Sequence, residues 1–76
     1  MTKVLSEIKQ SKTCTIESIN SNDVNVSEEL EILGFTPGTI VKVMNRSLFS
    51  GPLTVMLRGA KVAIRQSQAE LISVTA

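Results

Sequence analysis

The sequence predicts a mainly β protein, a small and strongly bent barrel of five or six short strands with one short α-helix near residues 27–33. Its 76 residues allow a single domain over residues 1–76 and hold too few strands for a sandwich. Through much of residues 40–65, alternate positions are apolar, which is the period of half-buried strands. All four glycines and both prolines lie between residues 34 and 59, where they mark turns.

The first predicted strand covers residues 13–19, a segment rich in β-branched side chains that favour extended backbone. An Asn-Ser-Asn-Asp loop follows at residues 20–23. The helix is then expected to begin with Ser27 as its N-cap and two glutamates in its first turn, where they complement the helix dipole. Gly34 is placed to end the helix, because glycine adopts the left-handed conformation common just after a helix.

Three further strands follow in the segment that holds the glycines and prolines. Their apolar residues alternate with the others, and they are Val41 and Val43, then Leu53, Val55 and Leu57, then Val62 and Ile64. The connections containing Ser50-Gly51-Pro52 and Arg58-Gly59-Ala60 are short enough for hairpins. Residues 66–71 are expected to form one helical turn, and Ile72 and Val74 indicate a last short strand.

Basic side chains stand next to the apolar residues of these strands, at the positions of opposite parity, whose side chains point to the other face of the sheet. They are therefore expected to face outward. They are Lys42, Arg58, Lys61 and Arg65. Residues 32–69 contain five basic residues and no acidic one, although the whole chain has a net charge of only +1. Two interpretations stay open: a solvated barrel exterior, or a basic surface for an acidic protein partner.

Apolar residues with outward parity, namely Ile40, Met44 and Met56, favour the second interpretation. Leu48 and Phe49 lie in the tip between two predicted strands, where they either fold back over the open end of the barrel or anchor a partner. The candidate partner-binding residues are Leu48, Phe49, Met44, Met56, Arg46, Lys42 and Arg58.

The composition argues against catalysis and against a resident metal or cofactor. There is no His, and the chain has neither a nucleophile elbow nor a phosphate-binding loop. Cys14 and the glutamates at 28, 29 and 31 are the conceivable iron ligands. A small buried hydrophobe explains Cys14, and a solvated helix terminus explains the glutamates, so no metal ligand is assigned.

Several binding functions and locations are also excluded by composition. With no Trp or Tyr, the chain lacks the aromatic residues that line proline-peptide grooves or stack nucleic-acid bases. The longest apolar runs have three residues, far short of the ~20 that a membrane span needs. The N-terminus has no apolar core of a signal peptide, so a cytoplasmic location is expected.

The stretch at residues 33–43, Leu-Gly-Phe-Thr-Pro-Gly-Thr-Ile-Val-Lys-Val, resembles the FeoA family, the ferrous iron transport protein A. Further matches follow in the family's order and spacing, at Gly51-Pro52, Arg58-Gly59, Ala63-Ile64-Arg65 and residues 69–74. Upstream, Leu5-Ser6-Glu7-Ile8 is similar to the family's opening, whereas Glu29-Leu30 stands where the family often has Arg-Leu.

The resemblance implies an SH3-like β-barrel with an accessory role in bacterial ferrous iron uptake. It also implies a partner, the cytosolic GTPase-bearing part of the FeoB membrane permease. The alternative is a regulatory module, because similar SH3-like domains close the C-terminus of metal-dependent transcriptional repressors and act through protein contacts. No helix-turn-helix pattern precedes the predicted barrel in this sequence, which favours the transport role.

Overall fold

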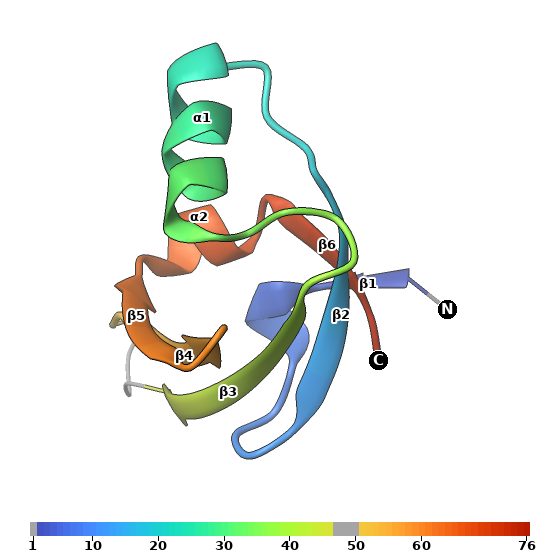
Figure 1. The fold of residues 1–76 in the computed structure, drawn as a ribbon, viewed down its shortest axis with the longest axis vertical. Helices are drawn as coiled ribbons and strands as arrows, with labels where there is room; N and C mark the ends of the chain where they lie inside the picture. The colour runs from blue at the N-terminus through green and yellow to red at the C-terminus, as the bar shows by residue number, and fades with distance from the viewer. Residues whose placement is uncertain (1, 47–50) are drawn as a thin grey trace.

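The computed structural model describes residues 2–46 and 51–76. These residues contain the strands β1 (Thr2–Val4), β2 (Thr13–Ile19), β3 (Ile40–Arg46), β4 (Leu53–Leu57), β5 (Ala60–Ile64) and β6 (Ile72–Thr75). The helical segments are the 3-10 turn η1 (Leu5–Glu7), α1 (Val24–Leu33) and α2 (Gln66–Ala69). The strands form one antiparallel sheet in the order β1-β6-β2-β3-β4-β5, and the predicted mainly β architecture is confirmed (Figure 1).

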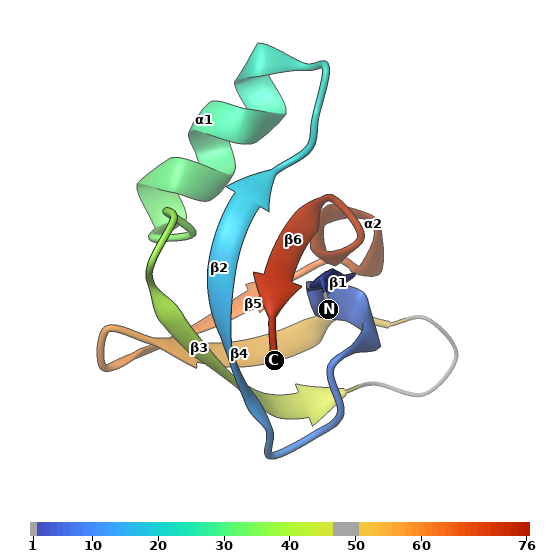
Figure 2. The same cartoon turned by 90° about the vertical axis from the view of Figure 1, so that its right-hand side faces the viewer.

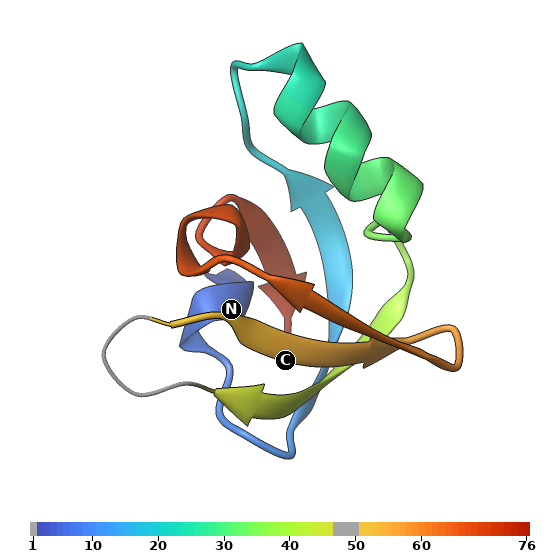
Figure 3. The same cartoon turned by 90° about the vertical axis from the view of Figure 1, so that its left-hand side faces the viewer.

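The sheet bends strongly around a small core (Figures 2 and 3). The register shifts between Ile16 and Ser18 on β2, and again between Val43 and Asn45 on β3. Such irregularities increase local twist and let a strand turn a corner. The alternation predicted for β4 is observed directly, because Leu53, Val55 and Leu57 are buried and the residues between them are half-buried.

The core combines strand residues with side chains from both helices and from η1. Its largest fully buried members are Phe35, Leu5, Ile16, Leu30, Leu53, Ile72, Val41, Val43, Val55 and Val74. Cys14 is also buried in this cluster, which confirms its interpretation as a small hydrophobe. Burial raises the pKa of the Cys14 thiol, because the thiolate loses its hydration in the core.

The helix α1 begins earlier than Ser27, and the predicted start is wrong. Asp23 is the N-cap, and its Oδ1 accepts a hydrogen bond from the backbone N–H of Asn25 at 2.9 Å. The backbone N–H of Asp23 in turn donates to Ser21 Oγ at 3.1 Å. Ser27 therefore lies inside the helix, and no acidic residue stands in its first turn. The two glutamates expected there, Glu28 and Glu29, lie in the middle of the helix instead.

The C-terminus of α1 is as predicted. Gly34 adopts the left-handed conformation with φ of 111°, and its N–H donates to the carbonyl of Glu31 at 3.0 Å. Phe35 then donates its N–H to the carbonyl of Leu30, also at 3.0 Å, and its side chain turns into the core. This hydrogen-bond pattern closes the last turn and directs the chain toward β3.

The first strand and the turn η1 have no counterpart among the predicted elements. β1 pairs with β6, with Lys3 opposite Val74. The following turn buries Leu5 completely, and Ile8 beyond it is buried as well. The N-terminal segment therefore contributes to the core, although its apolar residues are too few to show a period.

Candidate partner-binding surface

The outward-facing residues of β3, β4 and β5 lie side by side across the sheet. The strand register places Lys42 opposite Met56 and Met56 opposite Lys61. Ile40 lies two residues from Lys42 on the same side of β3 and is 66% exposed. We call these four residues, together with Arg58 in the β4–β5 turn, the outer sheet face. The parity argument for the outward position of its basic residues is confirmed, because all three are exposed.

The two predicted methionines on these strands are half-buried. Met56 lies within the outer sheet face, between two lysines. Met44 lies at the register shift of β3, between the paired residues Val43 and Asn45. A partly buried methionine offers an adaptable apolar surface without a large cost of exposure in the free protein.

Arg58 extends the outer sheet face toward the segment that follows α1. It has a positive φ of 51° in the two-residue turn of the β4–β5 hairpin (Figure 3). Its guanidinium donates to Thr36 Oγ1 at 3.3 Å. Arg58, Thr39 and Ile40 line a shallow hollow with Pro37 and Gly38. The hollow places a cation beside an exposed apolar side chain.

Arg46 differs from the other predicted basic residues. It is half-buried, and its guanidinium donates to the backbone carbonyl of Ile8. This bond ties the end of β3 to the segment after η1. Leu48 and Phe49, the predicted apolar anchors, lie outside the described residues.

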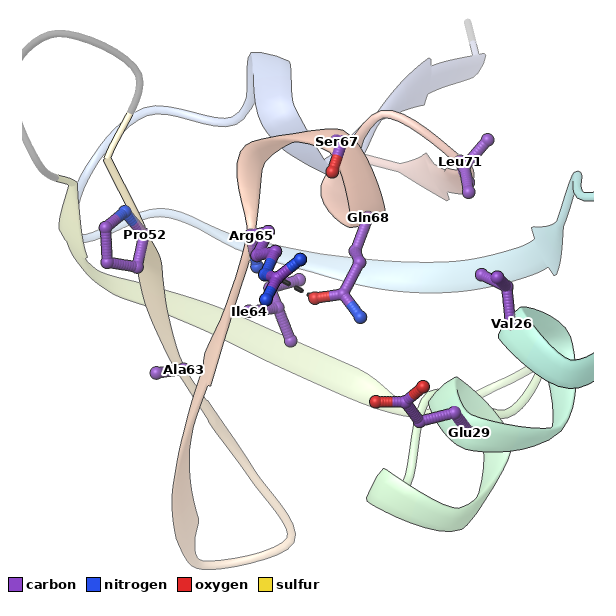
Figure 4. A pocket seen from close by; sticks show the side chains of 9 residues that line it. All are labelled: Val26, Glu29, Pro52, Ala63, Ile64, Arg65, Ser67, Gln68 and Leu71. Carbon is purple, nitrogen blue, oxygen red and sulfur yellow. Dashed lines mark hydrogen bonds between the residues drawn. The ribbon is translucent and has the colours of Figure 1, made fainter.

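A groove that the sequence did not indicate lies between α1 and α2, with a volume of about 620 Å³. Figure 4 shows Val26 and Glu29 of α1 on one side and Gln68 and Leu71 on the other. Arg65 enters from the end of β5, so the groove carries both signs of charge. The three-residue spacing of Val26 and Glu29 places them on adjacent positions of one helix face, but nothing in that spacing identifies the opposite wall.

Two further features bear on what the surface could bind. Within residues 2–46 and 51–76, no three His, Cys, Asp or Glu residues gather closely enough to hold a metal ion. None of the helices in this described part of the chain has the length and apolar character needed to cross a bilayer.

Comparison with known families decides the classification. The family model described as the FeoA domain matches residues 3–76, nearly the whole chain. The chain belongs to the FeoA family. A comparison with curated proteins found no match.

Solved FeoA structures have the same fold. An iron uptake regulatory protein, FeoA, is 25% identical with a TM-score of 0.89, and the match covers 99% of this chain and 97% of that one. The FeoA of Stenotrophomonas maltophilia, crystallised with zinc and described as a prokaryotic SH3 domain protein, is 27% identical with a TM-score of 0.82. That match covers 95% of this chain and 88% of the other. The expected SH3-like barrel is therefore confirmed.

A manganese-dependent transcriptional repressor also contains this fold. It matches 99% of this FeoA-family chain with a TM-score of 0.90 and 21% identity. The matched region makes up 41% of the repressor. At this identity the likeness concerns the fold alone, which two functional classes share.

Proposed function

We propose that this FeoA-family chain is a non-enzymatic, cytosolic accessory protein of ferrous iron uptake. It binds the cytosolic GTPase-bearing part of a FeoB-like membrane permease and modulates transport. Membership of the family supports the transport role. The observation that carries the binding role is the outer sheet face, where Lys42, Arg58 and Lys61 surround the apolar side chains of Ile40 and Met56.

This arrangement suits an acidic protein surface. No acidic residue occurs between residues 32 and 69, so the cations of β3, of β5 and of the β4–β5 turn have no carboxylate beside them on the same strands. Cations at the rim of an interface accelerate docking and set its register, whereas buried apolar anchors supply most of the affinity. Met56 lies at the centre of the row, between the two lysines, where such an anchor is most effective.

A charge reversal on the outer sheet face tests the proposal. We expect Lys42→Glu/Arg58→Glu to weaken binding to the purified GTPase domain by about tenfold or more, equivalent to ~1.4 kcal/mol, because attraction becomes repulsion. Isothermal titration calorimetry measures the change. Lys3→Glu/Lys9→Glu alters the net charge equally outside β3, β4 and β5 and is the matched control. Equal affinities for the two double variants would contradict the assignment of the surface.

A separate variant tests the two predicted apolar anchors. The sequence places Leu48 and Phe49 between β3 and β4, and we propose that they contact the same partner. Leu48→Ala/Phe49→Ala should then weaken binding at least tenfold at all salt concentrations, since apolar contact is not screened. An unchanged dissociation constant removes these two residues from the site while leaving the outer sheet face in place.

The regulatory role is the second candidate, and the shared fold with the repressor motivates it. The two roles predict different partners in cells. A pull-down with the tagged chain should recover the permease if the transport role is correct. Recovery of a DNA-binding repressor without the permease would favour the regulatory module.

A further inference from the structure

Two parts of this structure, α1 and the strands β3 to β5, carry charges of opposite sign. α1 and its cap contain four acidic residues and no basic one, namely Asp23, Glu28, Glu29 and Glu31. β3 and β5 contain basic residues, Arg58 lies in the turn between β4 and β5, and none of the three strands contains an acidic residue. α1 stands at one end of the molecule's longest axis, outside the bent sheet (Figures 1 and 2). The chain therefore presents an acidic helix and a basic sheet on different parts of its surface.

The acidic residues of α1 are poorly placed for the stability of the helix itself. Glu31 stands in the last turn of α1, where the helix dipole disfavours negative charge, and Glu28 and Glu29 stand in the middle of the helix, where the dipole does not favour them. Its last turn contains no basic residue to compensate. Glu28 and Glu31 are also like charges at a three-residue spacing, which repel each other. A local arrangement that costs stability in the free chain is typical of a surface that meets an opposite charge elsewhere.

The exposed side of α1 also carries two large apolar residues. Val24 is 67% exposed and Ile32 is 84% exposed, although both are large hydrophobic residues. At about 100° per residue, Val24, Glu28 and Ile32 lie on one stripe. This stripe is opposite Val26 and Leu30, which face the core. We call these three residues the outer helix stripe, and it repeats as apolar, acidic, apolar.

The outer sheet face has the complementary pattern. On β3, the exposed Ile40 is followed by the next outward residue, the cation Lys42. Across the sheet from Lys42, on β4, lies the half-buried Met56. Ile40 and Lys42 are successive outward residues of β3, ~6.7 Å apart, whereas Met56 lies across the sheet from Lys42 at ~5 Å. The sheet pattern therefore bends at Lys42, while the outer helix stripe is straight. The two patterns match in character, because an acidic residue between two apolar ones meets a basic residue between two apolar ones.

We propose that a second copy of this chain docks its outer helix stripe on the outer sheet face. Glu28 of one copy meets Lys42 of the other, while Val24 and Ile32 cover Ile40 and Met56. The contact joins two different surfaces, so each copy offers one donor helix and one acceptor sheet. The proposal does not depend on the permease, because only this chain takes part.

The size of the contact sets its strength. The helix is only ten residues long, about 15 Å. A face of that length falls below the ~1,200 Å² that stable interfaces bury, so the association is weak and depends on concentration. Self-association covers the same sheet that we assign to the transport partner. Binding to that partner would therefore release monomers from the self-associated form.

Sedimentation equilibrium over a concentration series up to ~1 mM tests the proposal. The wild-type chain should increase in average mass with concentration, and raising NaCl from ~0.1 M to ~1 M should weaken the association, because the screening length falls from ~10 Å to ~3 Å. Each of two variants disables one of the two contacting surfaces. Val24→Ser/Ile32→Ser removes the apolar residues of the outer helix stripe, and Lys42→Glu/Lys61→Glu reverses the charge of the outer sheet face.

Each variant alone should remain monomeric, with circular dichroism verifying that it is folded. An equimolar mixture of the two variants should form dimers, because the intact helix of one variant meets the intact sheet of the other. A wild-type chain that stays monomeric over the whole series would overturn the proposal. A mixture that fails to associate, while the wild type does, would equally overturn it, since the contact would then not join helix to sheet.

Discussion

Replacing Phe35 with alanine is expected to lower the free energy of unfolding by about 3–5 kcal/mol, the usual cost of truncating a buried aromatic residue. Phe35 is fully buried and is among the largest side chains of the core. It directly follows the end of α1, so its side chain also fixes how the helix joins the barrel. A domain of 76 residues has a total stability of only about 4–11 kcal/mol. The substitution therefore removes a large share of it.

Urea unfolding followed by far-ultraviolet circular dichroism measures this loss, because the chain contains no Trp for a fluorescence signal. Ile32→Ala is the matched control, since Ile32 is a large apolar residue that is mostly exposed. Its free energy of unfolding should change by less than ~0.5 kcal/mol. A Phe35→Ala loss no greater than that of the control would contradict the structure of the core.

β3, β4 and β5 were predictable because burial of one face imposes a period of two on a strand. Residues 13–19 were recognised instead by their β-branched side chains. The start of α1 was not, because Asp23 and Ser27 are both good caps and the sequence alone does not say which N–H groups need one. β1 has three residues, too few to show any period, and is defined by its pairing with β6.

For the candidate site, the sequence predicted which strand residues face outward but not which residues meet in space. Strand parity places Lys42 and Met56 outward, and the structure adds that they are direct neighbours across the sheet. The partial burial of Arg46 could not be predicted from its position on the strand, because its hydrogen bond to the carbonyl of Ile8 joins residues 38 positions apart. The groove beside Glu29 likewise depends on where α1 lies relative to α2, which no local pattern encodes. At the candidate site, long-range contacts are thus what sequence reasoning missed.

Gly34→Ala should be the second most damaging of these substitutions, with an expected loss of about 2–4 kcal/mol in the free energy of unfolding. Two effects combine at this position. The φ of 111° is a conformation that residues with a side chain rarely adopt. A methyl group there would also lie 2.8 Å from Cδ1 of Leu57. Leu57 is buried, so its side chain has little room to move away.

Gly38→Ala separates these two effects, because Gly38 also has a positive φ, 89°, but no atom lies within 4 Å of the added methyl group. It should cost only the conformational part, about 1 kcal/mol. The contact with Leu57 accounts for the remainder, and Gly34→Ala combined with Leu57→Ala should then cost less than the sum of the two single changes. Equal losses for the two alanine variants, measured by urea unfolding, would show that the contact with Leu57 is relieved without cost. Strict additivity in the double variant would lead to the same conclusion, and the left-handed backbone alone would then explain why glycine ends α1.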